Sequence, residues 1–281
     1  MKQVVVNILL HSYHKIIRRN FLRVWIKKLI GESKIIIDYK GIRLFAGTSS
    51  AIESNLIFNS YNEAFILELI GKYAEKNYTF VDIGANIGLH SLTAAKANKA
   101  IDIFSFEPES TNFKHFVNNM SLNPFSNIRP FHVGLGNFNG VSELNINEGW
   151  NKGKHSLKVN FNESSTKNRI PVATLDSFTS LIEKQHVLIK IDVEGFEKEV
   201  IQGAEKFFQK TVNSVLIIEL LTEVNGEINC KEIVANLSNF GFSSIYKITG
   251  EKTIKLVADF DGSADYIFVK GNATKDSLLF Q

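Results

Sequence analysis

An acid and two glycines stand close together in residues 79–95, in a pattern typical of a nucleotide site. Asp82 ends a short apolar run, Gly84 and Gly88 follow it, and apolar residues at helical spacing come next. This order of strand, tight turn and helix opens the βαβ units that bind nucleotides. A dinucleotide fingerprint has a second glycine where this chain has Asn86, so the pattern does not predict binding of a pyrophosphate.

The acid at position 82 favours a cationic ligand. A carboxylate there would repel a pyrophosphate, whereas S-adenosylmethionine carries a sulfonium, an ammonium and no phosphate. Gly84 and Gly88 would let the backbone approach such a ligand closely. Glu107 ends the next apolar run, residues 101–106, where an acid can accept hydrogen bonds from both ribose hydroxyls. Together these features predict an S-adenosylmethionine site.

A second pair of acids, Asp192 and Glu194, follows the apolar run of residues 187–191. Ligands in open α/β sheets bind at the carboxyl ends of the strands, beside the point where the strand order reverses, so we expect both acids beside the sulfonium. Lys190 alternates to the same side as Asp192 and can pair with it. We predict Glu194 as the base that accepts a hydroxyl proton and Asp192 as an aid to donor placement. His155 is the rival base, because its unperturbed pKa suits catalysis near neutral pH.

A metal-dependent alternative rests on three acids. Asp176, Asp192 and Glu194 could hold Mg²⁺, which would lower the pKa of an acceptor hydroxyl. We expect no metal, and full activity in EDTA would support that expectation.

A polar loop at residues 147–155 predicts an acceptor site for a sugar. Trp150 offers a face on which a pyranose ring can stack, and Lys154 and His155 offer groups suited to sugar hydroxyls. Long loops in compact domains are often functional, although an exposed hairpin tip with no role is the alternative. Asp176 has two interpretations as well: it suits the first turn of a helix, or it binds the acceptor.

Four segments of the sequence resemble the FkbM-type S-adenosylmethionine-dependent methyltransferases. They are V-D-I-G-A-N-I-G (81–88), F-E-P-E (106–109), T-L-D-S-F (174–178) and K-I-D-V-E-G-F-E (190–197). The resemblance covers about Tyr61 to Leu221 and implies O-methylation, often of sugars or glycosylated natural products. It further implies that Asp176 points into the pocket and that Glu63 lies near the donor. The predicted donor-binding residues are Asp82, Gly84, Ala85, Asn86, Gly88, Glu107, Pro108, Gly134 and Asp192.

The resemblance also implies an α/β fold of the class I methyltransferase, or Rossmann-like, type. We expect a mostly parallel seven-stranded sheet with an antiparallel last strand. The apolar patterns predict the third core strand over residues 128–135 and the last antiparallel strand pair over residues 242–248 and 265–270. Residues 61–281 would form this domain, with a β-hairpin inserted at about 141–170 that includes a strand over residues 156–161. Residues 1–60 would form an extension of a helix and a β-hairpin.

Glu219 is an acid inside an apolar run, so it is either paired in the core or lines the pocket.

The first thirty residues are basic and amphipathic. They contain seven Lys and Arg and no Asp or Glu, and their apolar residues recur at helical spacing, which predicts a helix over about His14 to Ile30. Its apolar face could dock on an anionic membrane surface. The alternative is that it packs on the domain or on a second subunit, as in a homodimer.

Composition excludes several classes of protein. A net charge of +3 argues against a nucleic-acid binder, a single Cys230 excludes an internal disulfide, and no apolar run is long enough to span a bilayer. We therefore expect a cytoplasmic protein, with a peripheral position at the inner face of the membrane as an addition. The predicted function is O-methylation of a sugar, glycan or glycosylated small molecule. An NAD-dependent oxidoreductase and a non-catalytic partner protein are the alternatives.

Overall fold

The computed structural model describes residues 2–15, 20–61, 63–146 and 166–272. The predicted sugar-binding residues Trp150, Lys154 and His155 lie outside these ranges, as does a strand expected over residues 156–161. Every structural statement below concerns the described residues.

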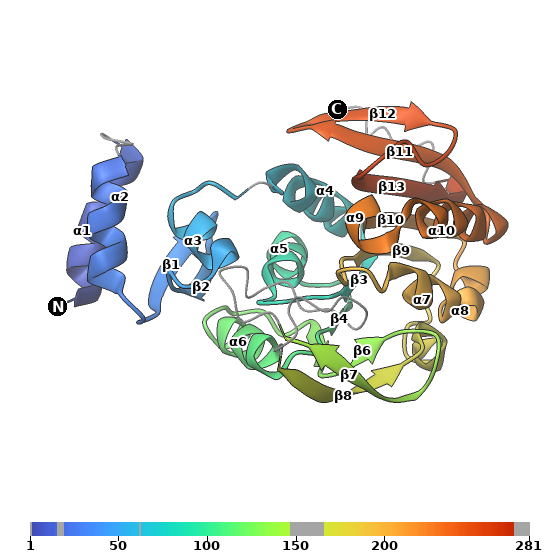
Figure 1. Ribbon diagram of the computed structural model, residues 1–281, viewed down its shortest axis with the longest axis horizontal. Helices are drawn as coiled ribbons and strands as arrows, with labels where there is room; N and C mark the ends of the chain where they lie inside the picture. Colours follow the sequence, from blue (N-terminus) through green and yellow to red (C-terminus); the bar gives the residue numbers. More distant parts are fainter. Residues whose placement is uncertain (1, 16–19, 62, 147–165, 273–281) are drawn as a thin grey trace.

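An eight-stranded sheet forms the centre of the molecule, with strand order β12-β11-β13-β10-β9-β3-β4-β5 (Figure 1). Strands β10, β9, β3, β4 and β5 are parallel, whereas β13 runs antiparallel to both β10 and β11. This confirms the expected class I methyltransferase architecture and adds one strand, β12, at the edge. The strands are β3 (Thr79–Ile83), β4 (Ile103–Phe106), β5 (Ile128–Phe131), β9 (His186–Ile191), β10 (Asn213–Leu220), β11 (Phe242–Gly250), β12 (Thr253–Val257) and β13 (Ala264–Lys270).

Helices cover both faces of the sheet (Figure 1). Parallel strands buried on both faces read as continuous apolar runs, and alternate residues enter two separate cores. Phe80 packs in the core beneath α4 and α5, whereas its neighbour Val81 packs in the core beneath α7, α8 and α10. The helices are α4 (Ala64–Glu75), α5 (Leu89–Ala97), α6 (Ser110–Ser121), α7 (Glu197–Gln202), α8 (Glu205–Lys210), α9 (Thr222–Asn225) and α10 (Glu227–Asn239).

The third core strand is shorter than the sequence predicts. A continuous strand over residues 128–135 is wrong: β5 ends at Phe131, and β6 (Gly134–Leu135) joins a second sheet of order β6-β8-β7. Gly134 pairs there with Val172 of β8 (Lys167–Ala173), and β7 (Gly140–Asn145) pairs antiparallel with β8. The described residues of the expected insertion at 141–170 thus belong to β7 and β8 of a small sheet, which carries Gly134 and Leu135 to the pocket described below.

The N-terminal extension contains two helices where the sequence predicts one. They are α1 (Lys2–Lys15) and α2 (Asn20–Ile30), followed by the expected β-hairpin of β1 (Ile35–Tyr39) and β2 (Ile42–Ala46), and by α3 (Ala51–Ile57). Residues Ile26, Leu44 and Phe80 belong to one continuous core, so the extension and the central sheet share buried surface. The domain boundary at residue 60 stays a prediction.

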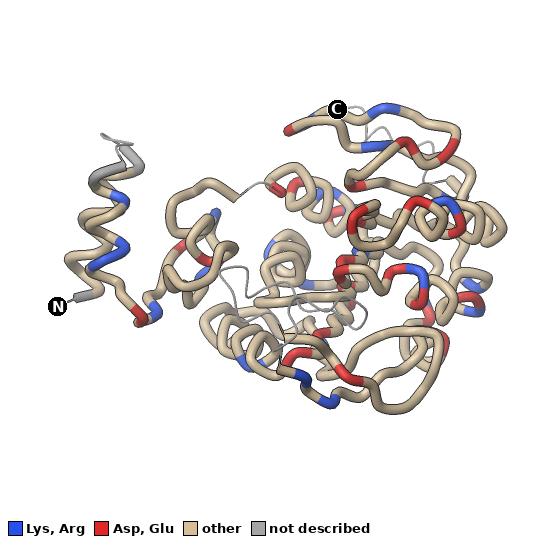
Figure 2. Tube along the Cα trace, viewed as in Figure 1, with Lys and Arg blue, Asp and Glu red and all other residues tan. Residues whose placement is uncertain are grey.

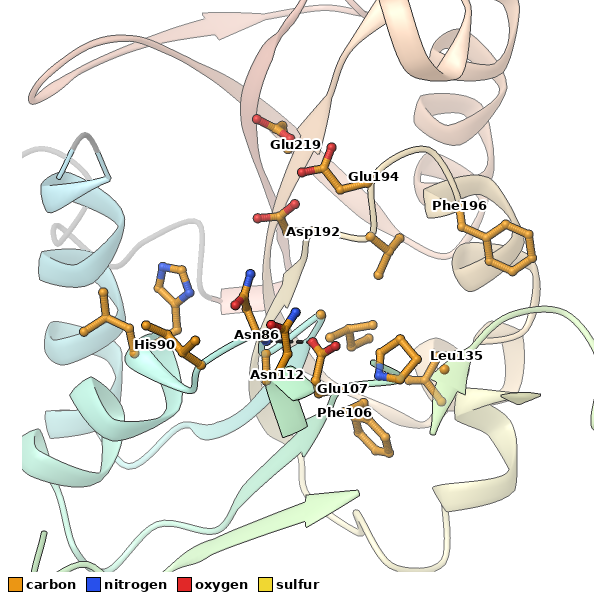
Figure 3. A pocket seen from close by; sticks show the side chains of 18 of the residues that line it. Asn86, His90, Phe106, Glu107, Asn112, Leu135, Asp192, Glu194, Phe196 and Glu219 are labelled. Carbon is orange, nitrogen blue, oxygen red and sulfur yellow. Dashed lines mark hydrogen bonds between the residues drawn. The ribbon is translucent and has the colours of Figure 1, made fainter. Parts of the chain in front are cut away.

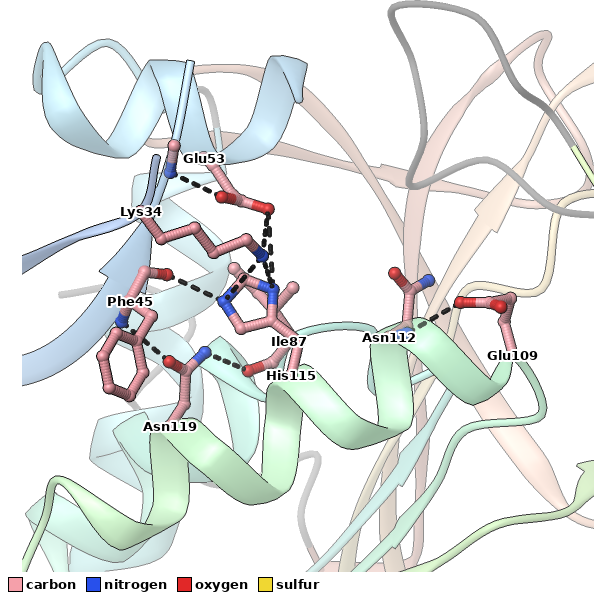
Figure 4. Close-up of polar contacts among 9 residues, drawn as sticks. Lys34, Phe45, Glu53, Ile87, Glu109, Asn112, His115 and Asn119 are labelled. Carbon is pink, nitrogen blue, oxygen red and sulfur yellow. Dashed lines mark hydrogen bonds and ion pairs between the residues drawn. The ribbon is translucent and has the colours of Figure 1, made fainter. Parts of the chain in front are cut away.

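A buried polar cluster fixes the extension to α6 (Figure 4). The His115 ring donates from Nε2 to the carbonyl of Phe45 at 2.8 Å, while its Nδ1 lies 2.7 Å from the Lys34 ammonium. Burial and the charge of Lys34 lower the pKa of His115, in keeping with a neutral ring that accepts at Nδ1. Asn119 accepts from the Phe45 N–H and donates to the carbonyl of Ile87. The extension therefore supports the turn that follows β3.

Candidate active site

A pocket opens at the carboxyl ends of β3, β4, β9 and β10, where the strand order reverses between β3 and β9 (Figure 3). This is where ligands bind in open α/β sheets. Seven of the nine predicted donor-binding residues line it: Gly84, Ala85, Asn86, Glu107, Pro108, Gly134 and Asp192. Asp82 and Gly88, which were also predicted to bind the donor, do not line the pocket.

Asp82 is fully buried below the pocket floor. Its Oδ2 accepts from the Ser91 hydroxyl at 2.5 Å, and that hydroxyl also lies 2.7 Å from Ser105 Oγ. Asp82 lies two residues before Gly84 on the same face of β3, beneath the first turns of α5, and it does not line the pocket. Burial raises the pKa of this carboxyl. Asp82 thus ties α5 to the sheet, and its donor-binding role stays a prediction.

The turn after β3 needs its glycines for packing. Gly84, Asn86 and Gly88 have φ angles of 83°, 52° and 85°, a region that favours glycine. A Cβ on Gly84 would lie 1.9 Å from the Asp192 carbonyl oxygen, and one on Gly88 would lie 2.0 Å from the Phe116 ring. Gly88 thus lets α6 approach, while Gly84 lets the β3 and β9 ends meet at the pocket.

Glu107 presents a buried carboxylate at the end of β4. Its Oε2 accepts from the Asn86 N–H at 2.8 Å and its Oε1 from the Glu109 N–H at 2.8 Å. Burial raises the pKa of Glu107 to about 7, although these two hydrogen bonds oppose the shift. Each oxygen keeps a second lone pair, so the carboxylate can still accept the two hydroxyls of a ribose. The hydrogen-bonding groups on this side of the pocket therefore fit the predicted nucleoside.

Three acids gather at the other end of the pocket (Figure 3). One carboxylate oxygen from each of Asp192, Glu194 and Glu219 lies within 4.8 Å of the other two. Glu219 lines the pocket, which is one of the two positions that the sequence allowed for this acid. Carboxylates this close can hold a divalent cation, and Asp176 of the metal-dependent alternative is replaced in this cluster by Glu219.

Lys190 anchors the acid cluster from below. Its ammonium is buried and lies 2.9 Å from Asp192 Oδ2 and 4.0 Å from Glu63 Oε2, which confirms the predicted pair with Asp192. Burial opposes its charge, but the two carboxylates outweigh that effect and raise the pKa of Lys190. Burial alone would also raise the pKa of Glu63, yet Lys190 and His90 hold it at about 2. Glu63 is thus ionised beside a fixed cation.

Glu194 occupies a strained turn that Glu197 holds in place. Glu194 has a φ of 52°, and Gly195 follows with 101°. Oε1 of Glu197 accepts from the N–H groups of Val193 at 3.3 Å and Gly195 at 3.2 Å, on either side of Glu194. Glu197 is almost fully buried, and burial raises its pKa. Non-glycine residues keep such a conformation only where their surroundings enforce it.

Asp176 serves a helix rather than the pocket. Its carboxylate accepts from the N–H groups of Lys206 and Phe207 at 3.1 and 2.8 Å, so it caps the start of α8. It does not line the pocket, and the acceptor-binding role predicted for it has no support in this geometry. His132 also lies outside the lining, stacked on Phe113 with centroids 4.8 Å apart.

Sequence reasoning missed several lining residues. Tyr61 and His90 border the donor turn, and Asn112 stands in the first turn of α6 beside Glu107 (Figure 3). His90 and Asn112 each occupy the first turn of a helix that follows a core strand, and that position is a usable signal because such turns face the ligand side of the sheet. Ile52 of α3 had no such signal, since only the docking of the extension brings it to the pocket.

Comparison with known protein families identifies the chain. The model described as "Methyltransferase FkbM domain" matches residues 82–244, more than half of the 281 residues. The chain belongs to the FkbM methyltransferase family. The resemblance carried by the four motifs is confirmed, and the protein is a methyltransferase. Methyl transfer in this family uses S-adenosylmethionine, and the glycine turn, Glu107 and the acids beside it fit that cationic nucleoside.

Two curated relatives and one solved structure are similar to this FkbM methyltransferase. Hexuronic acid methyltransferase AglP of Haloferax volcanii is 27% identical over 230 residues, which cover 79% of this chain and 88% of AglP. Methyltransferase 1 of Beauveria bassiana is 26% identical over 156 residues, covering 49% of this chain and 62% of that protein. The methyltransferase FkbM of Methylobacillus flagellatus is 16% identical, with a TM-score of 0.43 over 78% of this chain and 52% of that one.

Proposed function

We propose that this methyltransferase transfers the methyl group of S-adenosylmethionine to a hydroxyl oxygen of a sugar. The observation that carries the proposal is a single pocket in which Glu107 and the glycine turn face Asp192, Glu194 and Glu219. The relative AglP, whose name gives a hexuronic acid as its acceptor, supports a sugar. The predicted loop residues Trp150, Lys154 and His155 remain proposed acceptor contacts.

The chain's residues have three tasks in this reaction. The donor supplies a methyl group on a positively charged sulfur, which is already activated for in-line displacement. Glu107 holds the nucleoside end, and the acid cluster at the other end complements the positive charge. The third task is to align the acceptor oxygen with the methyl group. This alignment increases the rate, because oriented reactants lose little further entropy in the transition state.

Glu194 is the proposed base. Its carboxylate lies at the pocket mouth, and Glu197 fixes the backbone on both sides of it. It accepts the hydroxyl proton as the new oxygen–carbon bond forms, a contribution of typically about 10²–10⁴-fold. Asp192, held by Lys190, helps to place the donor. His155 is the alternative base.

Calorimetry and a transfer assay test the proposal. S-adenosylhomocysteine should bind at micromolar concentrations and NAD should not. Radiolabelled methyl should pass to oligosaccharides that contain a hexuronic acid, and hydrolysis should return an O-methyl sugar. Glu194→Gln should abolish turnover and keep donor binding, while the exposed control Glu227→Gln should match the native enzyme. Turnover retained in Glu194→Gln but lost in His155→Ala would transfer the base role to His155.

Donor binding without transfer to any sugar tested would favour the non-catalytic alternative. Transfer to a nitrogen or carbon acceptor would refute O-methylation. Binding of NAD in place of S-adenosylhomocysteine would refute the donor assignment itself.

A further inference from the structure

Helices α1 and α2 form a pair at one end of the molecule, away from the central sheet (Figure 1). They pack together through buried residues that include Val6, Leu10, Ile26 and Ile30. The Tyr13 ring contacts the Phe58 ring of the extension edge to face. The Arg23 guanidinium lies 4.6 Å from the centroid of the same Phe58 ring. The pair is thus a folded part of the extension, with a defined inner and outer side.

The outer side of this pair carries exposed apolar side chains. Of the thirteen large apolar side chains that are exposed in the described part of the chain, six belong to these two helices. They are Val4, Val5, Ile8, Val24, Trp25 and Leu29, and we call them the apolar face. Trp25 is 56% exposed and Val24 is 63% exposed. Apolar side chains concentrated in this way mark a surface that binds something.

The first thirty residues carry the net positive charge of the protein. Residues 1–30 contain seven Lys and Arg and no Asp or Glu, so the remaining 251 residues have a net charge of 3 − 7 = −4. Figure 2 shows basic and no acidic positions along α1 and α2, in contrast to the mixed charges of the rest of the molecule. Exposed Lys28 stands between Val24, Trp25 and Leu29 at helical spacing. Apolar and basic side chains therefore share one surface.

We propose that the apolar face docks on an anionic lipid bilayer surface. Valine, leucine and tryptophan side chains would enter the boundary between headgroups and acyl chains, where the tryptophan ring is favoured. The lysines and arginines would remain among the anionic headgroups, each contributing about fivefold to the affinity. The helices lie along the surface, because no helix in the described ranges is long and apolar enough to cross a bilayer.

Charge argues against a second copy of the chain as the occupant. A two-fold dimer through this face would bring exposed Lys28 of one subunit near Lys28 of the other, and both N-terminal segments carry a net positive charge. No acidic residue in the first thirty positions can offset that repulsion. An anionic bilayer complements the same charges, so it satisfies both features of the surface at once.

Vesicle sedimentation with the full chain tests this proposal. Vesicles of phosphatidylcholine with phosphatidylglycerol should bind the protein, and those of phosphatidylcholine alone should not. High salt should release it, because screening weakens the attraction. In a Trp150→Phe background, the fluorescence of Trp25 should shift to shorter wavelength on binding.

Matched variants separate the two features of the surface. Lys27→Ala with Lys28→Ala should lower partitioning about thirtyfold, and Trp25→Ala with Leu29→Ala should lower it as well. The control, Ile228→Ala with Leu256→Ala, removes two apolar side chains of equal or greater exposure elsewhere and should bind as the native chain does.

Two results would overturn the proposal. One is unchanged binding to anionic vesicles in both α2 variants, each of which must show native circular dichroism and S-adenosylhomocysteine binding. The other is a stable dimer in lipid-free light scattering that the Trp25→Ala, Leu29→Ala variant converts to a monomer, because the apolar face would then be a subunit interface. Neither result depends on the acceptor, so the proposed sugar specificity is tested separately.

Discussion

Replacing Glu197 by alanine should disable methyl transfer while leaving donor binding close to native. Oε1 of Glu197 accepts from the N–H groups of Val193 and Gly195, and Glu197 is only 1% exposed. Alanine would leave both N–H groups without that acceptor. Glu194, between them, would then no longer be held at a φ of 52°.

The magnitude follows from two opposing quantities. A typical intramolecular hydrogen bond contributes about 0.5–1.5 kcal/mol net. Two such bonds therefore stabilise the turn by about 1–3 kcal/mol. The left-handed conformation of a non-glycine residue costs roughly 1–3 kcal/mol. Since the two are similar, the alanine variant should populate other turn conformations, and kcat should fall about 100-fold through misplacement of the base.

The conservative variant distinguishes positioning from charge. Glutamine keeps an oxygen at Oε1 that can accept from both N–H groups. Glu197→Gln should therefore keep kcat within about threefold of native, because neither hydrogen bond to the turn is lost. Steady-state kinetics would give kcat and KM, and calorimetry would give the Kd for S-adenosylhomocysteine. A Glu197→Gln variant as inactive as Glu197→Ala would refute the argument, as would a Kd that rises in step with the loss of kcat.

Three further changes test the rest of the site. Glu107→Gln should weaken S-adenosylhomocysteine binding by about 10–100-fold in calorimetry, since ribose hydroxyls lose a charged acceptor worth about 1.5–3 kcal/mol. The same variant should change the pH dependence of unfolding. The native carboxyl has a pKa of about 7 against a reference of 4.5, so the native state retains a proton that the unfolded state loses, and stability should fall as pH rises through this window. Urea titrations should show that slope in the native protein and a smaller one in the variant. Lys190→Met should lower the free energy of unfolding by about 3–5 kcal/mol, because it leaves Asp192 and Glu63 without their buried cation. Adding Glu63→Gln should restore part of that loss, and an additive second loss would argue against the network. Dialysis against EDTA should leave methyl transfer unchanged, whereas a loss that Mg²⁺ reverses would make Asp192, Glu194 and Glu219 metal ligands.

The sequence predicts those parts of the site that are read from local pattern. Strand, turn and helix follow one another within residues 79–95, and the acids at the strand ends follow directly from apolar runs. Glu107, Asn86 and Asp192 were assigned to the pocket in this way and line it. Asp82 was assigned by the same reasoning and is buried, because residue type and spacing do not show how far a side chain lies below the end of its strand.

Features that depend on docking were not accessible to such reasoning. Ile52 reaches the pocket because Glu53 of α3 and Phe45 of β2 both contact His115 of α6, and these residues lie more than sixty positions apart. The break between β5 and β6 depends on pairing of Gly134 with Val172, in a sheet whose partner strand comes thirty-eight positions later. At the N-terminus, the predicted helix over about His14 to Ile30 corresponds to α2, and α1 (Lys2–Lys15) was not predicted.

The register of the parallel strands explains why Asp192 and Glu219 lie side by side at the pocket. Ile83 pairs with Ile191, and Ile191 pairs with Ile218. The next residues along these three neighbouring strands are Gly84, Asp192 and Glu219, which therefore stand in one row across the sheet. Side chains alternate between faces, so the Asp192 and Glu219 side chains point to the face that carries Lys190. A shift of one residue in either pairing would send an acid into the opposite, apolar core. The buried isoleucines thus set the positions of Asp192 and Glu219, and the burial of apolar side chains stabilises the arrangement of charges in the pocket.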